Sequence, residues 1–154
     1  MYIKNDLYKE IVDKTIIQTL DIVFLNENNK ILLWLRNNPP LKWIYYIPWW
    51  RRNKNETILE SAKRKSKEEL WIDIELNKLT FLWVYDVIYE DSMFEWIWSH
   101  YSPIVFIYKL SKIEEKNIKN DKQHEDFKFF NINDENLCYM LSEKIADINK
   151  LYIL

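Results

Sequence analysis

The pattern of apolar and polar positions alternates between short β-type runs and amphipathic helical segments. Apolar residues at helical spacing predict a helix over residues 6–14, and the β-branched run 16–25 predicts a strand. A polar turn at 26–29 leads into a returning strand over 30–36. Further along, we expect strands over 42–48, 72–75, 79–89, 100–110 and 126–132, loops over 37–40 and 90–95, a charged connection over 111–125, and a final helix over 142–151.

The clearest helical signal lies over residues 57–70. Thr57 and Glu60 have the spacing of a capping box, in which each side chain bonds the other residue's backbone N–H. Arg64 and Glu68 form an i,i+4 pair of opposite charge. Together with the order of the strands, this predicts an α/β (α+β) fold in one domain over 1–154, with a mixed β-sheet sandwiched between α-helices.

Composition narrows the class of protein. The chain has 154 residues and 48% hydrophobic content, enough for one packed core, and a net charge of −2 that argues against a nucleic-acid binder. No apolar run is long enough to span a membrane, and the single cysteine, Cys138, favours a cytoplasmic protein. With two histidines and one cysteine, we expect oxygen ligands for any metal, hence Mg²⁺ or Mn²⁺.

In the segment 50–72, the spacing of the glutamates and the arginine suits the binding of a divalent cation. Five residues separate Trp50 from Glu56, seven separate Glu56 from Arg64, and Glu68-Glu69 precede Ile72 by two residues. A loop followed by a helix can hold a divalent cation between carboxylates, a loop carbonyl and a diphosphate. The spacing resembles the Nudix box, although tryptophan stands at both of its glycine positions. A solvated helix with Glu–Lys pairs is the alternative interpretation.

Residues outside the box indicate one subgroup of this superfamily. Over nearly its whole length, the chain is similar to GDP-mannose mannosyl hydrolases. That subgroup also lacks the first glutamate of the box's Arg-Glu pair, which Lys65 replaces here. The carrying stretches outside the box are Leu20-Asp21, residues 33–36, 38–40 and 46–51, Ser99-His100-Tyr101, and residues 123–126.

The resemblance implies Mg²⁺-dependent hydrolysis of a GDP-hexose to GDP and free sugar, with water attacking the anomeric carbon, in a homodimer. It also implies site roles. His124 is the implied general base, assisted by Arg36 and Arg64. Asp21, Arg36, Arg51 and Tyr101 are the implied substrate contacts, and the Trp49 carbonyl, Glu68, Glu69 and Gln123 the implied metal ligands. Val87 stands where the family has a histidine near the leaving group, which is a departure.

Two alternative functions stay open at this point. A Nudix pyrophosphatase would cut a nucleoside diphosphate sugar, or another nucleotide, between its phosphates. A non-catalytic nucleotide-sugar binding module would keep the pocket without turnover. His124 as a surface histidine and Tyr101 as a core residue are the corresponding structural interpretations of individual site residues.

Glycine is absent from the chain, whereas tryptophan occurs eight times. Glycine usage of about 7% is normal for a globular domain. Trp34, Trp43, Trp49, Trp50, Trp71, Trp83 and Trp96 fall where the similar family has glycine, and the position of Trp98 is ambiguous. Our hypothesis is that the natural protein carries glycine there, through UGA codons read as tryptophan; a deliberate Gly→Trp series is the other explanation. As written, the chain is expected to be poorly stable.

Overall fold

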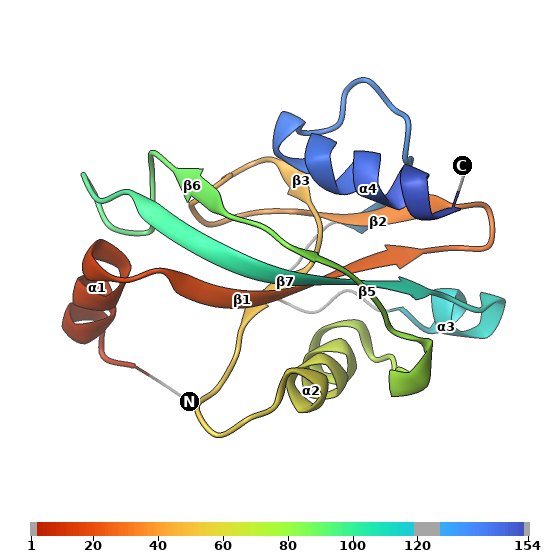
Figure 1. Cartoon of the computed structure of the whole chain (residues 1–154), viewed down its shortest axis with the longest axis horizontal. Coiled ribbons are helices and arrows are strands. Elements are labelled where there is room, and N and C mark those ends of the chain that lie inside the picture. The colour runs from red at the N-terminus through yellow and green to blue at the C-terminus, as the bar shows by residue number, and fades with distance from the viewer. Residues whose placement is uncertain (1–2, 119–126, 153–154) are drawn as a thin grey trace.

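The computed structural model describes residues 3–118 and 127–152 (Figure 1). Helices and strands alternate along these residues in an α+β order. The helices are α1 (Asn5–Lys14), α2 (Ile58–Leu70), α3 (Lys112–Asn117) and α4 (Ser142–Tyr152), with 3₁₀ turns at Leu76–Lys78 and Tyr139–Leu141. The strands are β1 (Ile17–Leu25), β2 (Lys30–Leu35), β3 (Tyr45–Tyr46), β4 (Trp49–Arg51), β5 (Thr80–Val84), β6 (Val87–Tyr89), β7 (Ser99–Lys109) and β8 (Phe127–Asn131).

The strands form one mixed sheet, in which β1 is the central strand. It pairs in parallel with β7 along its whole length, from Ile17 opposite Tyr101 to Leu25 opposite Lys109. Its other edge pairs antiparallel with β4 at one end and with β2 at the other. β3 and β8 also pair with β2, while β5 and β6 pair with β7. β4 pairs with β1 at Thr19, Leu20 and Asp21 and β2 pairs with it at Leu25, so β2 and β4 form a fork along this edge of β1.

Helices cover both faces of this sheet, as expected for the predicted fold class (Figure 1). One apolar cluster lies between the sheet and α2 and includes Leu20, Phe24 and Ala62. The second lies on the α4 side and includes Val23, Leu33 and Ile148. The alternation of β1 side chains between the two clusters explains why its sequence reads as a continuous apolar run.

The predicted capping box at the start of α2 is confirmed. Glu60 N–H donates to Thr57 Oγ1 at 3.2 Å, and Thr57 N–H donates to Glu60 Oε2 at 2.8 Å. At the other end, Trp71 adopts the left-handed conformation with φ 63° and its N–H bonds the Ser66 carbonyl. Both ends of the helix that carries the candidate carboxylates are therefore fixed by local hydrogen bonds.

Four sequence predictions differ from the structure. The strand expected over 42–48 is reduced to β3, because Trp43 turns the chain and Pro48, just before β4, has no N–H for a ladder. Residues 72–75 are irregular, and the expected strand 79–89 breaks into β5 and β6. The charged connection over 111–125 contains α3, which begins with a second capping box that joins Ser111 and Glu114. That Ser-x-x-Glu signal is visible in the sequence and was missed.

Among the residues that the structure describes, six adopt a left-handed backbone, and three of these are tryptophans: Trp43, Trp71 and Trp96, with φ of 67°, 63° and 62°. The others are two asparagines and Leu41. Asparagine tolerates this region, whereas a bulky side chain there costs on the order of 1–2 kcal/mol. All three indoles are exposed, by 65%, 63% and 98% respectively, so little burial offsets the strain.

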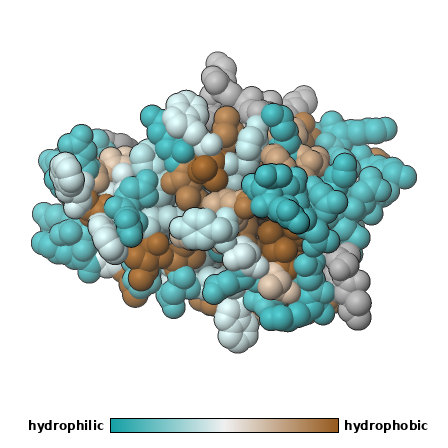
Figure 2. Space-filling model, turned by 90° about the horizontal axis from the view of Figure 1, so that it is seen from above, coloured by the Kyte–Doolittle hydropathy of each residue, from teal (hydrophilic) through white to brown (hydrophobic). Residues whose placement is uncertain are grey.

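Among residues 3–118 and 127–152, no helix is long and apolar enough to cross a bilayer. The face that carries α4 is a mixture of hydrophilic and hydrophobic patches (Figure 2). Several large apolar residues are exposed on this structure, among them Phe81, Trp83 and Val84 on β5 and Trp98 in the loop before β7.

Candidate active site

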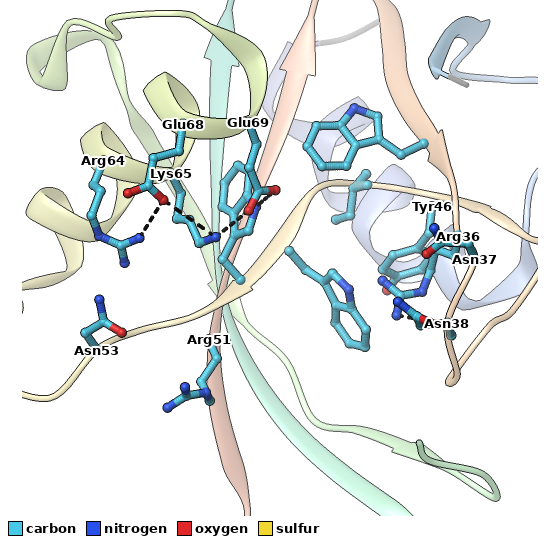
Figure 3. A pocket seen from close by; sticks show the side chains of 14 residues that line it. Arg36, Asn37, Asn38, Tyr46, Arg51, Asn53, Arg64, Lys65, Glu68 and Glu69 are labelled. Atoms are coloured by element: carbon cyan, nitrogen blue, oxygen red, sulfur yellow. Dashed lines mark hydrogen bonds and ion pairs between the residues drawn. The ribbon is translucent and has the colours of Figure 1, made fainter. Parts of the chain in front are cut away.

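One cavity of about 540 Å³ opens between α2 and the strands beside the fork. Figure 3 shows Arg64, Lys65, Glu68 and Glu69 reaching into it from α2, with Arg36 on the opposite wall. Its wall thus brings together six of the predicted site residues, from three elements. These are Arg36, Trp49, Arg51, Arg64, Glu68 and Glu69.

Arg64 organises the entrance to α2. Its guanidinium donates to both carboxylate oxygens of Glu56, at 2.6 and 2.8 Å, and to Glu68 at 3.0 Å. Asn53 N–H also donates to Glu56, at 3.1 Å. The Arg64 hydrogen bonds and, to a lesser extent, the Asn53 N–H lower the pKa of Glu56 to about 2, against burial. The loop before the helix is therefore tied to the helix itself by a bidentate ion pair.

Glu56→Gln is expected to lower the free energy of unfolding by about 1–2 kcal/mol at pH 7, because the bidentate pair is lost. The native pKa lies below the unfolded value, so the contribution of Glu56 is complete above pH ~4.5 and disappears as the pH falls towards 2. Urea unfolding at pH 7, 4 and 2.5 measures this. Glu75→Gln, at an exposed position, is the control, and an equal loss at pH 7 and 2.5 would contradict the role of the pair.

Glu69 is the most enclosed acid on the cavity wall, with 11% of its side chain exposed. Trp50 Nε1 donates to one of its oxygens at 2.5 Å, and Lys65 Nζ pairs with the other. Within the described ranges, no group of three or more His, Cys, Asp or Glu residues is arranged to hold a metal. Glu68, Glu69 and a loop carbonyl still supply the hard oxygen donors that Mg²⁺ prefers, so the residues present fit this ion.

The opposite wall carries the arginines. Arg36 Nε donates to the Pro40 carbonyl at 2.7 Å, which fixes its guanidinium 4.3 Å from the centroid of the Trp49 ring. Arg51, on β4, lines the same cavity. Burial lowers the pKa of Arg36, although it stays a cation at neutral pH. Two arginines that line the same cavity as two carboxylates suit a diphosphate held beside a divalent ion.

Asp21 lies beneath this wall and is 1% exposed. Burial raises its pKa to about 7, while Lys144, the Thr19 hydroxyl at 3.1 Å and Arg36 act against that rise. Lys144, at 2% exposure, donates to the Tyr46 hydroxyl at 3.2 Å, and its ammonium lies 4.7 Å from the Tyr85 ring centroid. Sequence reasoning identified Asp21 but missed Lys144, which reads as one more surface lysine of a charged helix.

A second, smaller cavity of about 170 Å³ lies beside the first. Tyr101 lines it, 4.9 Å from Trp49 between ring centroids, and burial raises the pKa of Tyr101 to about 12. Val87 is the strand partner of Tyr101 in the β6–β7 pair. Tyr101 is thus part of a cavity wall as well as the core. The two cavities share Arg36, Trp49, Trp50 and Arg51.

Two predicted site residues, Gln123 and His124, lie outside the described residues. Their roles as metal ligand and general base therefore stay predictions. The described ends of the chain on either side of them are Ile118, which follows α3, and Phe127, which begins β8. β8 pairs with β2, the strand that leads into Arg36.

The NUDIX domain family model matches residues 17–151, so the chain belongs to the Nudix family. The low-salt glycan biosynthesis protein Agl8 of Haloferax volcanii is 30% identical over 129 residues, which cover 83% of this chain and 79% of Agl8. A MutT NUDIX hydrolase from Burkholderia pseudomallei has a similar fold, with a TM-score of 0.70 at 18% identity, over 88% of this chain and 99% of that one.

A second solved structure, the NUDIX domain of Shewanella oneidensis NrtR in complex with ADP ribose, has a TM-score of 0.66 at 15% identity and covers 97% of this chain and 99% of that one. The structural similarities confirm the mixed α+β fold. The segment 50–72 lies within the matched NUDIX domain. Nudix hydrolases act on nucleotide-linked substrates with divalent metal ions.

Proposed function

We propose that this protein hydrolyses a GDP-hexose of the GDP-mannose type to GDP and free sugar, with Mg²⁺ or Mn²⁺. The observation that carries the proposal is one cavity that Arg36 and Arg51 line together with Glu68 and Glu69 of α2. This charge pattern suits a diphosphate bound through a cation. The similarity to a glycan biosynthesis protein supports a sugar-linked nucleotide as substrate.

In this proposal the arginines hold the diphosphate, and Arg64 positions the acids of α2. Arg36 is preorganised by its bond to Pro40, while Arg51 lies on the same short strand as Trp49, two residues further on. Glu69, Glu68, the Trp49 carbonyl and Gln123 would hold the cation, which neutralises charge on the departing diphosphate. Asp21 and Tyr101 would contact the substrate or the leaving group.

His124 would take the proton from the attacking water. Its ordinary pKa lies near neutrality, which suits a general base. Water then adds to the anomeric carbon as the bond to the diphosphate oxygen breaks, and GDP leaves. A homodimer in the cytoplasm completes the proposal.

Product analysis tests the proposal. Incubation with GDP-mannose and Mg²⁺ is expected to yield GDP and mannose, detected by ion-exchange chromatography and a reducing-sugar assay. GMP and mannose 1-phosphate would instead identify a pyrophosphatase. Binding of GDP-mannose with no product in either the written chain or a glycine-containing variant would identify a non-catalytic module. His124→Gln is the control: unchanged turnover would contradict its role as the base.

A further inference from the structure

Three tryptophans combine a backbone conformation that favours glycine with a side chain that is mostly exposed to solvent. Trp43, Trp71 and Trp96 have the left-handed φ that favours glycine, and each indole is largely exposed. Trp71 is the clearest example, because it follows α2 where its N–H must bond the Ser66 carbonyl. These positions need the backbone conformation and make little use of the indole.

Two further tryptophans crowd the candidate active site. Trp49 and Trp50 are neighbours on β4, so their side chains leave opposite faces of the sheet. The Trp49 ring lies between the Arg36 guanidinium and Tyr101, at 4.3 and 4.9 Å. The Trp50 indole is buried under α2, 6.3 Å from the Trp34 ring, and donates to Glu69. The Trp49 indole therefore covers Arg36, an arginine of the proposed substrate site. The Trp50 indole takes up a hydrogen-bonding position on Glu69, a candidate metal ligand.

The same two residues line both cavities, of about 540 and 170 Å³. Arg36 and Arg51 also line both, so each arginine can be reached from either cavity. Removal of the two indoles would enlarge both cavities where they share these residues.

We propose that Trp43, Trp49, Trp50, Trp71 and Trp96 stand where this fold is built for glycine, and that in the glycine-containing chain the two cavities form one substrate cleft. The cleft places the diphosphate on Arg36 and Arg51 and one of its two substituents in the cavity lined by Tyr8, Met93 and Tyr101. The ligand class, a nucleoside diphosphate sugar, rests on the proposed function. The glycine assignment does not.

The first test concerns the backbone. Trp71→Gly is expected to raise the Tm by about 3 °C or more relative to Trp71→Ala, because only glycine removes the Cβ penalty. Alanine removes the same indole and is therefore the matched control. Asn55→Gly and Asn55→Ala give the reference for a left-handed residue that is already tolerated. Equal Tm values for the two Trp71 variants would overturn the glycine assignment at that position.

The second test concerns the cleft and compares three proteins. They are the written chain, a three-glycine chain (Trp43→Gly, Trp71→Gly, Trp96→Gly) and a five-glycine chain that also carries Trp49→Gly and Trp50→Gly. Calorimetric titration with GDP in the presence of Mn²⁺ is expected to show at least about tenfold tighter binding to the five-glycine chain only. Mn²⁺ alone, followed by electron paramagnetic resonance, is expected to bind this chain more tightly because Glu69 loses its indole partner.

The outcomes separate the cleft from the reaction. Equal GDP affinity in the three-glycine and five-glycine chains would overturn the single cleft. If the five-glycine chain bound GDP more tightly and yet converted GDP-mannose to GMP, or to no product, that result would support the cleft and contradict the proposed function. If the written chain released GDP from GDP-mannose as fast as the five-glycine chain, the proposed function would be supported and the single cleft contradicted.

Mass spectrometry of the protein from its natural source tests the assignment directly. Glycine in the peptides that cover positions 49 and 71 is expected, as for UGA codons decoded as glycine. Tryptophan in those peptides would overturn it.

Discussion

Replacing Lys144 with methionine is expected to destabilise the protein by about 3 kcal/mol at pH 8, because the substitution leaves the Asp21 carboxylate buried without its cation. The loss is expected to be smaller at pH 5. The Asp21 pKa, already raised to about 7, rises further without Lys144, so the native state is neutral there at pH 5 and charged, or forced to take up a proton, at pH 8. Urea denaturation at the two pH values measures the difference.

The double variant Asp21→Asn/Lys144→Met completes this test. Its stability is expected to exceed that of Lys144→Met at pH 8, because no uncompensated carboxylate remains. The same comparison at pH 5 is expected to show little gain. A loss for Lys144→Met that does not vary with pH would mean that only packing around Tyr46 and Tyr85 was affected.

Glu69→Gln is the second large effect. In the five-glycine chain it is expected to slow Mg²⁺-dependent GDP release by on the order of 10²-fold or more, and to weaken Mn²⁺ binding, because an anionic oxygen ligand is replaced by an amide. The amide keeps the size of the side chain, so the helix and its packing stay the same. Steady-state kinetics and Mn²⁺ titration by electron paramagnetic resonance measure the two quantities.

Glu60→Gln is the matched control for this prediction. Glu60 lies on the same helix and caps it through Thr57, but it does not line the cavity. Its replacement is expected to reduce stability while Mn²⁺ affinity stays unchanged. Similar Mn²⁺ affinities for the Glu69→Gln and parent chains would remove Glu69 from the metal site.

Local sequence signals predicted the parts of the fold that depend on short-range contacts. The capping box of α2 and the apolar run of β1 were visible because a hydroxyl, a glutamate and apolar periodicity act over a few residues. The shortening of the strand expected over 42–48 to Tyr45–Tyr46 was not predicted, because it depends on Trp43 turning where sequence propensity favours extension. α3 was missed although its Ser111 cap is equally local.

The candidate site likewise contains residues that the sequence predicted and residues that only tertiary packing brings into place. Glu69 and Arg64 were predicted from the spacing of the segment 50–72 and its resemblance to the Nudix box, and Asp21 from the similarity to the GDP-mannose mannosyl hydrolases. Lys144 could not be found, since its burial depends on α4 packing over Tyr46 from a distant part of the chain. The indole N–H of Trp50 on Glu69 likewise follows from tertiary placement and from no local pattern.

The buried link between Lys144 and the sheet has a consequence for synthesis. Asp21 is translated early, on the first strand, whereas its cation arrives on α4 near the end of the chain. The parallel pairing of β1 with β7 imposes a similar delay, because the central strand waits for a segment made much later. On the ribosome the site therefore forms last, because a sheet that closed over Asp21 before α4 was made would bury this carboxylate without the ammonium of Lys144.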